Sequence, residues 1–267
     1  MKNWEFKNQP YIQRIRFFYL ILSFLVFYFG LAQFMKISTE APITESGILS
    51  LLNGWPYTYT SIAIALAMIA VSVLAAFYWE SQILRISVVV FFFIFKDLFN
   101  SFGTSNNLFQ FWFWAAILFS FIPSLYNKKE STRFFYLSWG TWGAKGIVLL
   151  FYGLSGLWKI IGFFSQWVKS EEHIFTMKGL SYHLASEIIR AGRNPIFKDF
   201  ILQNTALNPL LMLTVVLTQL FCFVAIVKPQ FMKPAGLMLL LFHIGSFLTL
   251  SISFPTGFLL VLVLLLF

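Results

Sequence analysis

Long apolar stretches separated by short polar segments make up most of the chain. About 20 apolar residues are enough for a helix to cross the hydrocarbon of a bilayer. Seven stretches meet or approach that length: Phe17–Met35, Tyr57–Trp79, Ile83–Phe95, Leu108–Tyr126, Tyr136–Phe164, Leu210–Val227 and Ala235–Leu250. The third is short, and either tilts or extends through Lys96 and Asp97 to Phe102. The pattern predicts an all-α, polytopic bundle of transmembrane helices that forms a single domain.

An eighth apolar stretch begins after Pro255 and is still apolar at Phe267. It raises the predicted number of spans to seven or eight. Because this stretch has no flanking charge, we expect the natural chain to continue past Phe267. The first stretch is too long for a signal-peptide core and has no small-x-small cleavage site, so we interpret it as a retained helix.

One long segment, Gln166 to Asn208, breaks the apolar pattern. Between His173 and Ala191 the apolar residues recur at helical spacing, interleaved with polar side chains that include His183. This spacing predicts an amphipathic helix that lies in the membrane interface or covers a cavity. A lipid-surface helix without a chemical role stays open as the alternative.

Composition supports the membrane interpretation. The 267 residues are 59% hydrophobic and 11% charged, with 35 phenylalanines. Soluble domains are about a quarter charged, so this chain has too little polar surface for a water-exposed globule. The net charge of +9 comes from short basic clusters between apolar stretches, which would contact anionic membrane lipid. We therefore do not expect nucleic acid as a partner.

The distribution of lysine and arginine favours a cytoplasmic N-terminus. That orientation places most of the basic residues of short segments inside: Lys2, Lys7, Arg14, Arg16, Arg85, Lys128, Lys129, Arg133, Lys228 and Lys233. It leaves the segment Gln166 to Asn208 outside, although this segment is also basic. Long segments follow the rule less strictly.

Polar groups inside a bilayer are costly and are therefore functional candidates. The fifth predicted helix carries the largest set within about one third of its circumference: Ser138, Thr141, Lys145, Tyr152, Ser155, Gly156 and Lys159. Five glycines on this helix would let neighbouring helices approach closely. Burial in an apolar pocket favours the neutral form of a lysine, which could then act as a base. Alternatively, Lys159 snorkels to the headgroups or pairs with Glu171 or Glu172.

The remaining candidates are weaker. His243 lies in the seventh stretch and is either catalytic or hydrogen-bonded to a neighbouring helix. Asn106 and Asn107 precede the fourth stretch and could cap it. The single cysteine, Cys222, has no partner thiol and is interpreted as a buried apolar residue. We find no metal-ligand spacing such as HxxxH and no phosphate-binding glycine loop, so no metal site is predicted.

Several ordered motifs resemble those of the HTTM (horizontally transferred transmembrane) superfamily. Tyr152, Gly156 and Lys159, followed by Ile160, resemble its "Y-x-x-x-G-x-x-K-L" segment. Phe242-His243 resembles its later "F-H" helix. The superfamily includes vitamin K-dependent gamma-glutamyl carboxylase and bacterial relatives that are linked to peptide-toxin maturation. The resemblance implies an integral membrane protein, with a bacterial inner membrane as the expected location.

The resemblance also implies roles for individual residues. In the carboxylase the lysine of the first motif is proposed to deprotonate a hydroquinone cofactor. That role would fall to Lys159, with His243 and Tyr152 beside it as further catalytic candidates, and a quinone or hydroquinone would be the cofactor. The family histidine near the start of the fourth helix corresponds here to Asn106 or Asn107. We take Lys145, Ser155, Asn107 and His183 as candidate substrate-binding residues.

Two functions from different classes remain open at this point. One is a membrane enzyme that acts on a quinone-like or lipidic reactant with Lys159 as base. The other is a non-catalytic subunit that holds or matures a partner membrane protein or secreted peptide, with the Gln166 to Asn208 segment as docking surface. A small-molecule transporter is disfavoured, because the chain has no matching halves with broken helices.

Overall fold

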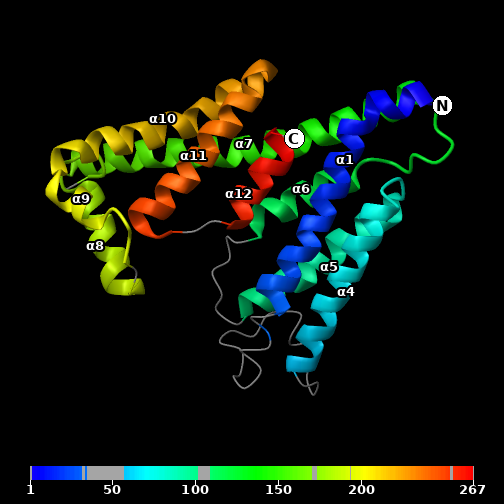
Figure 1. Ribbon diagram of the computed structural model, residues 1–267, viewed down its shortest axis with the longest axis horizontal. Helices are drawn as coiled ribbons and strands as arrows, with labels where there is room; N and C mark the ends of the chain where they lie inside the picture. Colours follow the sequence, from blue (N-terminus) through cyan, green and yellow to red (C-terminus); the bar gives the residue numbers. More distant parts are fainter. Residues whose placement is uncertain are drawn as a thin grey trace. The chain divides into compact units, whose positions relative to one another are not determined.

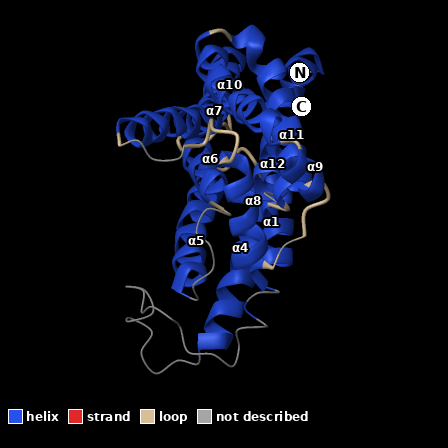
Figure 2. Cartoon of the chain, turned by 90° about the vertical axis from the view of Figure 1, so that its left-hand side faces the viewer, coloured by secondary structure: helices blue, strands red, loops and turns tan. Residues whose placement is uncertain are grey.

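The computed structural model describes residues 2–31, 34, 57–101, 109–169, 173–192, 194–252 and 255–266. Within these ranges every regular element is a helix and none is a strand (Figure 2). The prediction of an all-α chain is therefore confirmed for the described residues. The chain divides into two compact units, which we call unit 1 (Met1–Ile147) and unit 2 (Val148–Leu266).

Unit 1 is built around the central helix α4. Its elements are α1 (Lys2–Leu25), the π-helix η1 (Val26–Leu31), α4 (Tyr57–Phe77), α5 (Gln82–Ser101), α6 (Gln110–Ser120) and the first half of α7 (Glu130–Val168). Helix α4 packs against both α1 and α5, and α6 packs against α5 (Figure 1). Small buried side chains of α4, such as Ser61, Ala65 and Ser72, permit this close packing.

Aromatic rings fill the core of unit 1. Phe18 of α1 has its ring centroid 4.9 Å from that of Trp112 and 5.0 Å from that of Phe119, both on α6. All three side chains are fully buried. Stacked and edge-to-face ring pairs of this kind stabilise a core beyond the apolar area that they bury. The phenylalanine-rich composition therefore serves internal packing here as well as contact with lipid.

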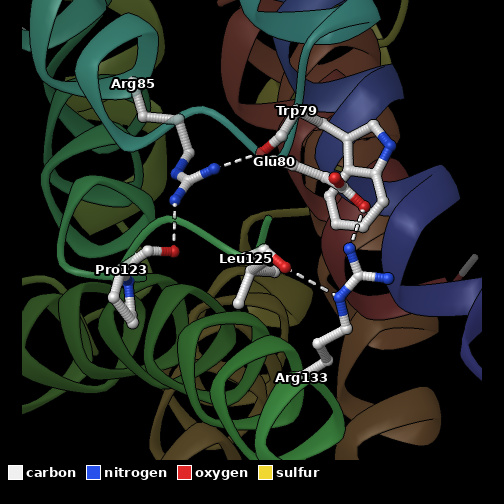
Figure 3. Close-up of polar contacts among 6 residues, drawn as sticks. All are labelled: Trp79, Glu80, Arg85, Pro123, Leu125 and Arg133. Carbon is white, nitrogen blue, oxygen red and sulfur yellow. Dashed lines mark hydrogen bonds and ion pairs between the residues drawn. The ribbon is translucent and has the colours of Figure 1, made fainter. Parts of the chain in front are cut away.

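A buried arginine joins two turns of unit 1. Arg85, in the first turns of α5, is only 1% exposed. Its guanidinium donates hydrogen bonds to the backbone carbonyls of Phe119 (3.0 Å), Pro123 (3.0 Å), Trp79 and Ile122. The last carbonyls of a helix have no intrahelical donor, and the negative end of the helix dipole favours a cation. Arg85 therefore caps α6 and ties it to the α4–α5 turn (Figure 3).

Arg133, near the start of α7, strengthens the same junction from the other side. It donates to the carbonyl of Leu125 at 2.8 Å and forms an ion pair with Glu80 at 2.6 Å (Figure 3). The backbone N–H of Leu125 donates to the carbonyl of Glu80 at 3.2 Å. The Arg133–Glu80 pair is about one fifth exposed, so water weakens it more than it weakens the Arg85 bonds.

Unit 2 is built around α10 and α11. Its elements are the second half of α7, α8 (Gly179–Ala191), α9 (Lys198–Gln203), η2 (Thr205–Leu207), α10 (Asn208–Val227), η3 (Pro229–Phe231), α11 (Met232–Leu250), α12 (Pro255–Val261) and the π-helix η4 (Leu262–Leu266). Helix α11 packs against α10, α12 and η4. Helix α8 packs against α9, α10 and α11. Its contacts centre on a core formed by Leu180, Leu184, Ile201 and Met212.

Five helical segments are long and apolar enough to cross a membrane: Gln9–Leu31, Tyr59–Phe77, Glu130–Val168, Thr205–Val227 and Pro229–Leu250. These segments fit an integral membrane protein. Helix α5 has 20 residues but carries Arg85, Lys96 and Asp97, while α6 and the apolar run Pro255–Leu266 are shorter than a crossing requires. The structure thus supports five of the predicted spans by length and composition.

Two predicted boundaries were wrong. The fourth stretch was expected to be helical to Tyr126, but α6 ends at Ser120. Pro123 explains the early end, because proline has no N–H and disfavours a helical residue before it. The amphipathic helix was expected from His173, but α8 begins at Gly179. Residues 173–178 form turns, with the N–H of Gly179 bonded to the carbonyl of Thr176 at 3.1 Å.

Candidate functional site

Lys159 lies in a polar contact between α7 and α10. Its side-chain nitrogen Nζ is 3.0 Å from Ser155 Oγ and 3.0 Å from Gln219 Oε1. Lys159 is half-buried, and Gln219 is only 2% exposed. No carboxylate contacts Lys159 among the described residues. Glu171 and Glu172, the partners that the sequence offers as alternatives, lie outside them.

Two turns earlier on the same face of α7, Tyr152 contacts α11. The Tyr152 hydroxyl and His243 Nε2 are 2.6 Å apart, and both side chains are buried. The rings meet edge to face with centroids 5.6 Å apart. A hydroxyl that shares a hydrogen bond with an imidazole can pass or receive a proton, and it also fixes the orientation of that imidazole. The contact is consistent with both interpretations of His243.

Glycine at position 257 lets α12 approach this pair. A Cβ atom at Gly257 would lie 3.1 Å from the Tyr152 hydroxyl and 3.2 Å from His243 Cε1. Any larger residue would push the phenol or the imidazole away. Helix α12 therefore forms a wall of the Tyr152–His243 contact, in addition to α7 and α11.

Glycines of α7 also bring α10 close to Lys159. A Cβ atom at Gly156 would lie 2.9 Å from Gln219 Cβ and 3.2 Å from the backbone nitrogen of Leu220. At Gly153 it would lie 2.9 Å from the ring of Phe223. The two helices are thus close enough for Gln219 to reach Lys159 directly. This agrees with the predicted role of the helix glycines at Gly153 and Gly156, whereas a Cβ at Gly143 would make only an ordinary contact with Leu118 at 3.6 Å and one at Gly146 would meet nothing within 4 Å.

Replacing Gly156 with alanine is expected to destabilise the protein by about 1–3 kcal/mol, because the added methyl group meets backbone that can move only if α10 shifts. Gly162→Ala is the matched control on the same helix, since a Cβ there meets nothing within 4 Å. The control should be neutral or slightly more stable, because alanine favours helix over glycine. Thermal unfolding in detergent measures both variants, and equal effects would contradict the close contact at Gly156.

A second polar location in unit 2 is an open pocket of about 220 Å³. It lies where the end of α7 meets the first turn of α8. Its lining residues are Gln166, His173, Ile174, Gly179, Tyr182 and His183. Among the described residues the lining thus combines two imidazoles, a phenol and an amide, without an acidic side chain.

Of the predicted site residues, Lys159, Ser155, Tyr152 and His243 lie together in unit 2, along one face of α7 and the helices that it contacts. His183 lines the separate pocket. Lys145 belongs to unit 1, and Asn107 lies outside the described residues. The structure therefore groups four of the seven candidates.

Sequence reasoning missed three residues of these sites: Gln219, Gly257 and His173. A signal existed for Gln219, because it is the one amide side chain between Leu210 and Val227, and an amide inside an apolar span is costly. Nothing in the sequence marks Gly257, because its role depends on which side chains α12 meets.

Comparisons with protein-family models, curated proteins and solved structures found no match to the chain.

Proposed function

We propose that this chain is an integral membrane enzyme, similar to the HTTM superfamily, in which Lys159 is a base that acts on a quinone-like or lipidic reactant. The observation that carries the proposal is the setting of Lys159 Nζ, which is held between Ser155 Oγ and Gln219 Oε1. Both are neutral acceptors. A lysine without an opposite charge beside it among the described residues is suited to gain and lose a proton.

The neighbouring groups fit a reactant that carries a hydroxyl. Ser155 can donate or accept a hydrogen bond, and the Gln219 amide can donate through its NH2 group, so a hydroxyl close to Lys159 would have partners for both its proton and its oxygen. A reduced quinone would supply there a weakly acidic hydroxyl and a source of two electrons. The Tyr152–His243 pair lies two turns earlier on the same face of α7, about 10 Å along the helix, so it would contact another part of a long reactant.

The proposal includes a topology. The five long apolar helices would be joined by α5 and α6 as a sixth and seventh span and by the run formed by α12 and η4 as an eighth, although α6 and this run are short for a crossing. The basic clusters orient the N-terminus toward the cytoplasm, and a bacterial inner membrane is the location that the resemblance implies. Helix α8 would then lie in the outer interface, because its Leu180 and Leu184 face inward while Ile189 is 84% exposed.

One observation favours the alternative of a non-catalytic subunit. Large apolar side chains of α8, of α9 and of the segment between them are exposed, among them Ile189, Ile196 and Phe200. A partner membrane protein or a secreted peptide could cover this surface, as could lipid. In that case the α8–α9 surface would be the functional region.

Bound lipid distinguishes the two functions. We would purify the protein in mild detergent, extract it and quantify isoprenoid quinone per chain by mass spectrometry. Losing a hydrogen bond to a charged group weakens binding by about 1.5–3 kcal/mol, so Lys159→Leu and Gln219→Leu should retain about ten-fold less quinone or lower. Lys228→Leu, at an exposed lysine beyond α10, is the control and should retain the full amount.

Two outcomes count against the enzyme. Equal quinone retention in all variants would contradict a reactant at Lys159. A stoichiometric protein partner that is lost in Ile189→Asp, while Lys159→Leu keeps it, would support the subunit.

A further inference from the structure

Two of the three histidines of the chain line the same pocket. His173 precedes α8 and His183 lies in its second turn, and both border the pocket of about 220 Å³ with Gln166 and Tyr182. This pocket lies outside the Lys159 and Tyr152–His243 contacts. Histidines are also the commonest metal ligands in proteins.

His173 Nδ1 is the informative atom. It is buried and has no hydrogen-bond partner among the described residues. A buried polar nitrogen without a partner costs about 1–3 kcal/mol, so its position requires an explanation. His183 is exposed and lines the same pocket, so its imidazole is open to solvent. The pocket is thus lined by two imidazoles, one of which carries a buried nitrogen without a partner among the described residues.

The surrounding contacts hold His173 in a defined orientation. Its ring meets that of Phe163 edge to face, with centroids 4.7 Å apart. The Thr176 hydroxyl donates to the His173 carbonyl at 2.8 Å. A Cβ atom at Gly179 would lie 2.6 Å from the carbonyl oxygen of Ile174, so only glycine fits this tight turn. The imidazole is therefore positioned before any ligand binds.

Asn208, at the start of α10, holds the turn formed by residues 173–178 in place. The side-chain nitrogen of Asn208 donates to the Met177 carbonyl at 2.7 Å and to Ser181 Oγ at 2.9 Å. Asn208 is fully buried. It therefore joins the turn that carries His173 to the helix that carries His183. Such rigid support is what a metal site requires of the residues around its ligands.

We propose that this pocket binds a divalent transition metal ion, such as Zn²⁺, Ni²⁺ or Cu²⁺, through the imidazole nitrogens of His173 and His183. Imidazole suits these metals. Among the described residues no group of three or more His, Cys, Asp and Glu side chains comes together. The ion would therefore keep open positions for water, for the Gln166 amide oxygen or for an added ligand. The proposal is independent of any role of Lys159.

Electron paramagnetic resonance with Cu²⁺ tests the proposal, because the nitrogen hyperfine pattern reports how many imidazoles bind. The protein is purified on a histidine-free affinity tag, stripped with chelator and titrated with Cu²⁺. The wild type should bind one ion with a two-nitrogen pattern. His173→Ala and His183→Ala should each show at most one nitrogen and weaken binding at least about ten-fold.

The third histidine provides the matched control. His243→Gln removes an imidazole outside the pocket, so its titration and its two-nitrogen pattern should match those of the wild type. Thermal unfolding of each metal-free variant checks that the fold is intact. A Cu²⁺ signal without nitrogen coupling would overturn the proposal. A signal that is unchanged in His173→Ala, or that is lost equally in His243→Gln, would overturn it as well.

Discussion

Replacing Arg85 with methionine is expected to lower the free energy of unfolding by about 3–5 kcal/mol. Methionine retains most of the apolar stem but none of the donors. The variant leaves four backbone carbonyls without the guanidinium, and the surrounding Phe119 and Ile122 are fully buried. Water could reach these carbonyls only if the α4–α5 turn separated from the end of α6. The loss can be measured by titrating purified protein in mixed micelles with increasing SDS.

Two further variants make this prediction specific. Arg85→Lys keeps the charge but has a single nitrogen that cannot reach four carbonyls. It should therefore lower the free energy of unfolding by about half as much as Arg85→Met does. Arg133→Met removes the partly exposed ion pair with Glu80 and should cost only about 1 kcal/mol. If Arg133→Met lowered the free energy of unfolding as much as Arg85→Met, the greater burial of Arg85 would not explain its contribution to stability. An Arg85→Lys variant as stable as the wild type would contradict the role of the four carbonyls.

The fold was predictable where hydrophobicity alone decides it. Helices α4, α10 and α11 begin and end close to the predicted apolar stretches, because the membrane requires a minimum apolar length. The end of α6 and the role of Arg85 were not predictable in the same way. Pro123 has no N–H for the Phe119 carbonyl, which accepts from the Ile122 N–H at 3.3 Å and from Arg85 Nε at 3.0 Å. From sequence, Arg85 was only a charge that helps to orient the protein.

The candidate site was predictable on one helix and not across helices. Helical spacing places Tyr152, Ser155 and Lys159 on one face of α7, and the structure agrees. Spacing cannot say which residues of other helices they meet, because that depends on rotation and depth of packing. Gln219 and Gly257 were missed for this reason. His183 was a candidate substrate-binding residue with Ser155, but it lines a separate pocket at α8.

Replacing Lys159 with alanine is expected to reduce the proposed activity by about 10²–10⁴-fold, the usual contribution of a general base. The assay places the protein in nanodiscs with a reduced quinone and measures dioxygen uptake. Reduced quinone and dioxygen give oxidised quinone and hydrogen peroxide, so the reaction balances without a further substrate. Lys159 would take the hydroxyl proton. Ser155 and Gln219, each 3.0 Å from Nζ, would hold the amine in place.

The Lys159→Arg variant distinguishes two roles of the Lys159 side chain, that of a base and that of a cation that only holds the structure together. Arginine keeps the positive charge and can still donate to Ser155 and Gln219, but its guanidinium does not release its proton. A base therefore predicts a loss comparable to that of alanine, with the thermal unfolding temperature unchanged in the arginine variant. If Lys159→Arg kept full activity, the side chain would act only as a charge that joins α7 to α10, and the enzymatic proposal would fail. Lys228→Arg, outside the site, should keep the rate of the wild type.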